Sequence, residues 1–223
     1  MGKKDTPLIS VIIPTKNASK YIKEALTCLL EQDLSFEVVV VDSSTDGTAT
    51  IAKELGAVVI ETPANDVEAR NIGLERATGE YIMFLDGDDV VNDGAIATML
   101  SELTNDTALQ MVSCMVKDFF SPELTKDELG DVAIKAEPYY GLLTGAVMIR
   151  RGLFDTLGKF DVNFSAAGGV AWLLKAQDSG VKHKKLPIVA TNRRIHTSNY
   201  GRTQRDNEFK NYANILRGRI KRG

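Results

Sequence analysis

Apolar runs of strand length alternate with segments of helical periodicity through the first half of the chain. The runs LISVIIPT (8–15) and FEVVVVDSS (36–44) are rich in β-branched residues. Such runs are typical of strands buried on both faces of a parallel sheet. The segment between them, 18–33, places its apolar residues on one face of a helix, for which Ser19 is the predicted N-cap.

This strand–helix unit recurs further along the chain. Helices are predicted over 45–56 and 66–79, each closed by a glycine, and strands over 57–62 and 80–86. The alternation predicts an α/β fold: an open, mostly parallel, Rossmann-like sheet with helices on both faces. In sheets of this kind, ligands bind at the carboxyl ends of the strands.

The second half of the chain is less regular. The pattern predicts helices over 94–105 and 168–180, strands over 109–120 and 183–196, a polar loop or flap over 121–138, and a strand running into a short helix over 139–158. We expect one domain over residues 1–203. A basic amphipathic helix or tail over 204–223 follows it, in which Phe209, Tyr212, Leu216 and Ile220 recur at helical spacing.

Composition favours a reduced, cytoplasmic protein. The chain has 223 residues, 43% hydrophobic and 26% charged, without an 18-residue apolar stretch or an apolar leader at its start, so neither a transmembrane helix nor a signal peptide is expected. Cys28 and Cys114 show no metal-type spacing.

Charge is unevenly distributed along the sequence. Residues 182–223 hold 12 Lys/Arg and 2 Asp/Glu, a balance of +10, and the remainder holds 15 and 28, a balance of −13. The tail is expected either to contact an anionic membrane or a protein partner, or to fold back on the acidic body. The first alternative places the protein peripherally at the inner membrane face; no nucleic-acid partner is expected.

Aspartates gather where two predicted strands end. Asp42 and Asp86 end these strands, and Asp46, Asp88 and Asp89 follow closely. Five carboxylates at one sheet edge require positive charge nearby. Oxygen ligands without cysteine suit Mg²⁺ or Mn²⁺, which commonly bridges carboxylates to substrate phosphates. The alternative, that Asp42 and Asp86 cap helices or turns, explains one aspartate better than five.

Four motifs then identify a resemblance that extends over roughly residues 7–200. They are SVIIPTKN (10–17), VVVVDSSTDGT (38–48), ARNIGLERATGEYIMFLDGDD (69–89) and TGAVMIRRGLFDTLGKFD (144–161). In order and spacing they resemble the family-2 glycosyltransferases with the GT-A fold. The resemblance implies a nucleotide-sugar donor, most often a UDP-sugar, and a divalent metal.

The resemblance also assigns roles to residues. It implies that Pro14, Thr15 and Asn17 line the nucleotide pocket, and that Asp42 recognises the base with Asp46 beside it. It also implies that Arg70 and Asn71 contact the donor. Asp86 and Asp88 would form the DXD pair, with Asp86 towards the ribose and Asp88 on the metal. For Arg70 a surface salt bridge with Glu68 or Glu75 is the alternative. His196, in an Arg-x-His match with Arg194, is expected to bind the metal or the diphosphate, or else to be structural.

One expected group is missing. An inverting transferase needs a carboxylate to deprotonate the acceptor hydroxyl, and the family supplies it from a Glu-Asp pair at the start of a late helix. Gly168 and Gly169 occupy that place here, and no acid lies between Ser165 and Trp172. Asp161 is the nearest substitute. Otherwise the acceptor needs no strong base, or the chain does not catalyse transfer.

Two functions follow from the sequence. The first is a metal-dependent glycosyltransferase with a nucleotide-diphospho-sugar donor and an unknown acceptor, inverting if active. The second is a glycosyltransferase-like protein that binds the donor or a partner without efficient transfer. A nucleotidyltransferase is disfavoured because the chain has no Gly-rich basic loop for a triphosphate.

Overall fold

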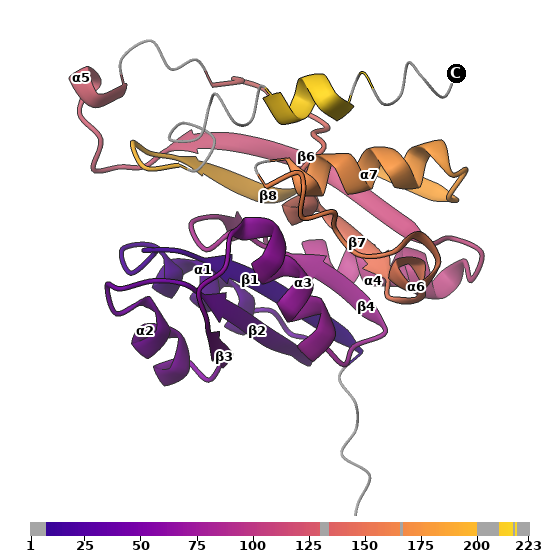
Figure 1. The fold of residues 1–223 in the computed structure, drawn as a ribbon, viewed down its shortest axis with the longest axis horizontal. Coiled ribbons are helices and arrows are strands. Elements are labelled where there is room, and N and C mark those ends of the chain that lie inside the picture. The colour runs from indigo at the N-terminus through magenta and orange to yellow at the C-terminus, as the bar shows by residue number, and fades with distance from the viewer. Residues whose placement is uncertain (1–7, 130–133, 166, 200–209, 216, 218–223) are drawn as a thin grey trace, which may run out of the picture.

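The computed structural model describes residues 8–129, 134–165, 167–199, 210–215 and 217 (Figure 1). Its strands are β1 Ile9–Thr15, β2 Phe36–Asp42, β3 Val58–Glu61, β4 Tyr81–Phe84, β5 Val90–Val91, β6 Met111–Phe120, β7 Val147–Arg150 and β8 His183–Ile195. Its helices are α1 Ile22–Leu30, α2 Thr48–Glu54, α3 Asp66–Arg76, α4 Ala95–Asn105, α5 Lys126–Leu129, the 3₁₀ turn η1 Thr144–Ala146, α6 Gly152–Leu157 and α7 Gly168–Asp178.

The strands form one mixed sheet in the order β3-β2-β1-β4-β7-β6-β8-β5. Strands β1 to β4 are parallel to their neighbours within this group, as predicted, and β6 is parallel to β8. Strand β7 is antiparallel to β4 and to β6, and β5 is antiparallel to β8. A parallel step requires a long crossover, usually a helix. The described part of the β6–β7 connection holds only the four-residue α5 and η1, and there the strand direction reverses.

Helices cover both faces of the sheet, as the sequence predicts. In β1, Val11 and Ile13 pack into the cluster formed with α1, α2 and α4. Ile12, between them, packs into the cluster formed with α3, α6 and α7. Figure 1 shows α1, α2 and α3 around β1 to β3, and α7 beside β6, β7 and β8. Burial on both faces explains the unbroken apolar runs of the first strands.

The ends of two helices differ from those predicted. The N-cap of α1 is Tyr21 rather than Ser19, whose backbone N–H instead donates to Asp46. Helix α3 ends at Arg76, with Ala77 as its C-cap, before Gly79. Gly79 is pressed against β1, where a Cβ would lie 2.7 Å from the carbonyl carbon of Ile9. This glycine therefore serves close packing and does not end the helix.

The tail lies largely outside the described residues. Residues 210–215 are helical and Ile215 is buried, whereas Phe209, Leu216 and Ile220 are not described. The division into 1–203 and 204–223 therefore stays a prediction. Within the described part of the chain, every helix is too short or too polar to cross a membrane.

Candidate functional site

The carboxyl ends of β1 and β2 form the first part of the site. Thr15 and Asp42 are direct neighbours in the register of these strands, and Pro14 precedes them in β1. The hydroxyls of Thr15 and Ser44 donate to Oδ1 of Asp42 at 2.6 and 2.5 Å. Asp42 is only 3% exposed. Its carboxylate is therefore fixed in orientation by hydroxyls of the chain, and its predicted contact with a base stays a prediction.

Asn17 shapes the loop next to this carboxylate. Its φ of 54° is in the left-handed region, which asparagine tolerates better than most residues. Its backbone N–H donates to Ser44 Oγ at 2.6 Å, and its side-chain oxygen accepts from the N–H of Thr45 at 3.0 Å. Pro14, Thr15 and Asn17 thus lie at the carboxyl end of β1, where Thr15 contacts Asp42, and their place in a nucleotide pocket stays a prediction.

Asp46 has a bracing role in the structure. It accepts from the backbone and hydroxyl of Thr48 at the start of α2, and from the backbone N–H of Ser19 at 3.1 Å. Partial burial raises the pKa of Asp46, but these hydrogen bonds outweigh burial and lower it overall. Asp46 therefore links the loop after β1 to the loop after β2, and a donor contact of its own stays a prediction.

Arg70 lies buried at the centre of the second part of the site, 6% exposed. Its Nε donates to Asp66 at 3.0 Å, its Nη1 to Thr144 at 2.8 Å and its Nη2 to Asp86 at 2.6 Å. The alternative prediction of a surface pair with Glu68 or Glu75 is wrong, since the partners are Asp66 and Asp86. Burial works against the guanidinium charge, but the two carboxylates raise the pKa of Arg70 overall.

The neighbouring Asn71 joins α3 to the loop before α7. Its side-chain amide donates to the carbonyl of Phe160 at 2.9 Å and accepts from the backbone N–H of Phe160 at 3.0 Å. Asn71 thus holds this loop in place, and its predicted donor contact stays a prediction.

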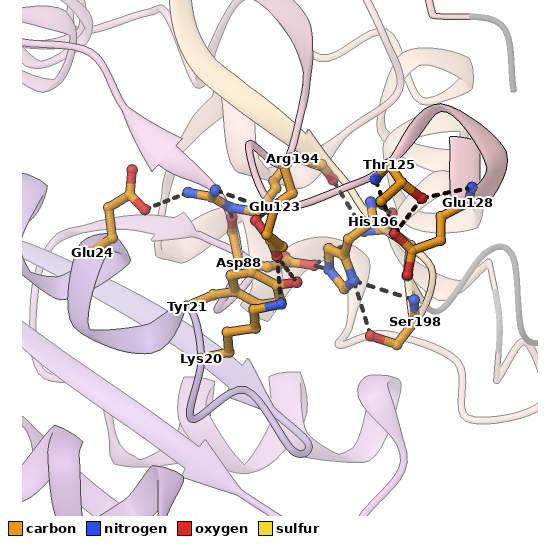
Figure 2. A network of polar contacts seen from close by, with 12 residues as sticks. Lys20, Tyr21, Glu24, Asp88, Glu123, Thr125, Glu128, Arg194, His196 and Ser198 are labelled. Atoms are coloured by element: carbon orange, nitrogen blue, oxygen red, sulfur yellow. Dashed lines mark hydrogen bonds and ion pairs between the residues drawn. The ribbon is translucent and has the colours of Figure 1, made fainter.

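Asp88 lies against the end of β8 (Figure 2). Its Oδ2 lies 2.8 Å from Nε2 of His196 and accepts from the side-chain amide of Asn199 at 3.2 Å. The ring of Tyr21 lies 4.5 Å from the imidazole, measured between centroids. The structure therefore brings together Asp88 and His196, which the sequence pairs only through the resemblance.

Arg194 bonds the same loop, which contains Asp88 and Asp89. Its backbone N–H donates to Asp89 at 2.9 Å, its Nε donates to the carbonyl of Asp88 at 2.9 Å, and its Nη2 pairs with Glu24 at 2.6 Å. Burial, together with the charges of Asp88 and Asp86, raises the pKa of Asp89 well above its usual range. Asp89 is thus a buried support of the loop.

The chain itself satisfies the aspartates. Arg70 pairs with Asp86, His196 and Asn199 bond Asp88, the backbone of Arg194 bonds Asp89, and hydroxyls bond Asp42 and Asp46. Positive charge therefore lies next to this cluster, as expected, and part of it comes from Arg70 itself. A divalent cation at this edge stays a prediction.

The donor set fits a divalent cation only in part. Two ligands at right angles, each about 2.1 Å from a metal, lie about 3.0 Å apart. The 2.8 Å between Asp88 and His196 is close to that spacing. Within the described ranges, however, no three His, Cys, Asp or Glu side chains are grouped as a metal site. Asp86 is held by Arg70, so substrate phosphates would have to complete the coordination.

The start of α7 contains no acid, as the sequence indicates. A Cβ on Gly168 would lie 2.5 Å from Cγ2 of Val67, and one on Gly169 would lie 3.1 Å from Cγ2 of Thr144. The helix is therefore packed closely against α3 and η1 at the place of the expected base. Asp161 bonds the backbone and side chain of Asn163 in its own turn, at 2.9 and 2.8 Å.

Sequence reasoning missed Asp66, Thr144 and Ser44 as members of the site. Asp66 precedes Arg70 by four residues, a spacing at which oppositely charged side chains meet on a helix. That signal was present in the sequence. Ser44 is two residues from Asp42, so that contact also has a local signal. Thr144 is 74 residues from Arg70, and the sequence carries no local signal for this contact.

Comparisons with known proteins agree with this geometry. The family described as "Glycosyl transferase family 2" matches residues 10–157. Poly(ribitol-phosphate) beta-N-acetylglucosaminyltransferase TarS of Staphylococcus aureus is 43% identical over 94 residues, which is 37% of this chain and 16% of TarS. Glycosyltransferase AglE of Haloferax volcanii is 26% identical over 191 residues, 78% of this chain and 62% of AglE. The chain thus spans less than two thirds of either relative.

Solved structures show the same fold. TarS residues 1–349 in complex with UDP superpose with a TM-score of 0.68 at 25% identity, covering 84% of this chain and 60% of that one. The mannosyltransferase PcManGT of Pyrobaculum calidifontis, in complex with GDP-Man and Mn²⁺, gives a TM-score of 0.74 at 22% identity, covering 99% and 66%. The chain therefore belongs to glycosyl transferase family 2 and has the GT-A fold.

Proposed function

We propose that the chain is a metal-dependent glycosyltransferase that uses a nucleoside-diphosphate sugar, most simply a UDP-sugar, and inverts the anomeric centre. The observation that carries the proposal is the pair formed by Asp88 and His196, 2.8 Å apart, on the same sheet edge as the fixed carboxylate of Asp42. This edge can hold a diphosphate between a base-binding end and a metal-binding end.

Each part of the edge has a chemical task. Asp42 accepts a hydrogen bond from the base, and Asn17 with Thr15 forms the wall beside it. Asp88 and His196 would hold Mn²⁺ or Mg²⁺, which stabilises negative charge on the leaving diphosphate. Arg70 holds Asp86 at 2.6 Å and so fixes the first DXD carboxylate near the donor.

The relatives support this choice of donor class. The TarS structures contain UDP and UDP-GlcNAc, and PcManGT contains GDP-Man with Mn²⁺. These ligands belong to those proteins. Here they define the probes to be tried, namely UDP-GlcNAc and GDP-mannose, which we call the donor panel.

Thermal unfolding with UDP and GDP tests donor binding. A ligand that binds only the native state raises the melting temperature in proportion to its saturation. We expect UDP to raise the melting temperature in Mn²⁺ and not in EDTA. In Asp88→Asn we expect UDP to have the same effect on the melting temperature in Mn²⁺ as in EDTA. Asp155→Asn, an exposed change on α6, is the control. Equal stabilisation by UDP with and without metal contradicts the metal role.

A second function is favoured by Gly168 and Gly169, which carry no base. In that case the chain binds its donor without efficient transfer. Release of UDP or GDP from the donor panel distinguishes the two functions, since the second predicts binding without release.

Membrane contact through 204–223 is a further part of the proposal. It rests on the basic residues of this segment, of which the structure describes only 210–215 and 217. Deletion of 204–223 is expected to abolish sedimentation with anionic vesicles and to leave thermal unfolding of the remaining domain cooperative. Loss of folding on deletion would favour packing on the parent domain.

A further inference from the structure

The acceptor side of the site lacks an obvious base, and this inference rests on the proposed function. Transfer to a hydroxyl requires a basic group within about 2.6–3.2 Å of the acceptor oxygen, and a carboxylate is the usual one. Gly168 and Gly169 offer none. A carboxylate from another element has to reach the same place if the chain turns over.

Asp66 reaches this region through Arg70. One planar guanidinium donates from Nε to Asp66 and from Nη2 to Asp86, so the two carboxylates lie on neighbouring nitrogens of one group. Asp86 is the first DXD residue, on the donor side. Asp66 is therefore separated only by the guanidinium of Arg70 from Asp86, the carboxylate proposed to face the donor.

Two further contacts place Asp66 beside the start of α7. Val67, the next residue of α3, is what a Cβ on Gly168 would strike at 2.5 Å. Thr144, the third partner of Arg70, is what a Cβ on Gly169 would meet at 3.1 Å. The first turn of α3 and the first turn of α7 are thus packed together, and Asp66 is the residue of α3 that directly precedes this contact.

Asp66 also has an available oxygen. Its side chain is 32% exposed, and Oδ2 accepts from Arg70. Among the described residues, Oδ1 makes no hydrogen bond. The alternative Asp161 uses its Oδ1 for two bonds within its own turn. Asp88 and Asp89 are already bonded to residues at the end of β8.

We propose that Asp66 is the general base of the transfer. As the acceptor oxygen forms a bond to the anomeric carbon, the bond from that carbon to the diphosphate oxygen breaks, and its electron pair leaves with the diphosphate. The acceptor proton passes to Oδ1 of Asp66, which then returns it to solvent through its exposed face. Arg70 holds Oδ2 and so fixes the direction of Oδ1.

The test compares Asp66→Asn with the natural chain on the donor panel in Mn²⁺, with water as acceptor, by release of UDP or GDP. Asparagine keeps an oxygen for Arg70 and removes the base. We expect kcat to fall on the order of 10²- to 10⁴-fold. We expect KM and the UDP dissociation constant to stay within about twofold, since the base acts in the transition state.

Three further variants make the result specific. Asp155→Asn, an exposed change on α6, is expected to leave kcat unchanged. Asp66→Glu is expected to recover part of the rate, because the carboxylate remains. Asp66→Ala is expected to gain rate when formate is added, because the anion can take the proton in place of the side chain. Thermal unfolding of each variant shows whether it is folded.

Each other outcome overturns the base role. If Asp66→Asn turns over as fast as the natural chain, the base is elsewhere. If UDP affinity falls together with kcat, Asp66 only positions Arg70. If the natural chain binds UDP in Mn²⁺ but releases nothing from any donor, donor binding stands and the base proposal fails. If it binds neither UDP nor GDP, the proposed function itself fails.

Discussion

Oδ2 of Asp88 lies 2.8 Å from Nε2 of His196, and this contact ties the loop after β4 to the end of β8. The two residues are 108 positions apart in the chain. Asn199 donates to the same carboxylate oxygen at 3.2 Å. The DXD loop is therefore held from the far end of the sheet, and any cation bound by Asp88 would be adjacent to His196.

The first prediction concerns this pair. His196→Ala is expected to lower the affinity for UDP in Mn²⁺ by at least the about 10- to 100-fold that loss of an outer-shell partner costs, because one of the two metal ligands proposed above is removed. Isothermal titration of UDP in Mn²⁺ measures the change. The control is His183→Ala at the start of β8, far along this strand from His196. It removes a hydrogen bond to Ser113 of β6. Unchanged affinity in His196→Ala would show that the imidazole only packs against Asp88.

The second prediction concerns Arg194. It is 3% exposed, pairs with Glu24, donates to the carbonyl of Asp88 and lies over the rings of Tyr21 and Phe119. Lysine cannot reproduce this planar fork. Arg194→Lys is expected to lower the free energy of unfolding by about 1–3 kcal/mol.

Urea unfolding of Arg194→Lys against the natural chain measures that loss. Arg76→Lys, an exposed change at the end of α3, is the matched control and is expected to change stability by less than about 0.5 kcal/mol. Equal changes in the free energy of unfolding for the two substitutions would mean that the contacts of Arg194 contribute little to stability.

The first four strands could be predicted because their signal is local. The residues directly before Asp42 and Asp86, 38–41 and 81–85, are all apolar, since both faces of β2 and β4 are covered there. The reversal at β7 could not be predicted, because it depends on which strand β7 pairs with rather than on its own four residues.

The site shows the same division. The strand-end aspartates are visible in the sequence, and the resemblance pairs Asp88 with His196. The contacts of Arg70 with Thr144 and Asp86 could not be predicted from the sequence, because these residues are 74 and 16 positions away from Arg70 in the chain. Only Asp66, four residues before Arg70, could have been found from helical spacing.

The third prediction concerns the cysteines and pH. Burial raises the pKa of Cys28 to about 11 and that of Cys114 to about 12, from 9.0. Above pH 9 the unfolded thiols lose protons that the native thiols keep, so the free energy of unfolding is expected to fall as pH rises from 9 towards these values. The loss approaches about 1.4 kcal/mol per pH unit for each thiol.

Urea unfolding at pH 7 and at pH 10 measures this slope. Lysines and tyrosines also titrate there, so the variant carrying Cys28→Ala and Cys114→Ala is the reference, and its slope is expected to be shallower. A thiol reagent at pH 8 is expected to modify the native chain far more slowly than the urea-unfolded one. Rapid native modification of both thiols would contradict their burial.

The last prediction concerns Gly168 and Val67. A Cβ at 168 would lie 2.5 Å from Cγ2 of Val67, which is fully buried and β-branched and therefore has little freedom to turn away. Gly168→Ala is expected to lower the free energy of unfolding by about 1–3 kcal/mol, although alanine favours a helix. Gly169→Ala, with its contact to Thr144 at 3.1 Å, is expected to cost less.

A double-mutant cycle with Val67→Ala separates this clash from other effects. In the Val67→Ala background the cost of Gly168→Ala is expected to vanish or change sign, because the new methyl fills the space that Val67 leaves. Additive costs would show that the clash is relieved by movement of α7 instead. Because the close contact fills the place of the expected acid, Gly168→Glu can be accommodated only after Val67 is shortened. A carboxylate restored at 168 in the Val67→Ala background therefore tests whether α7 can still supply the base.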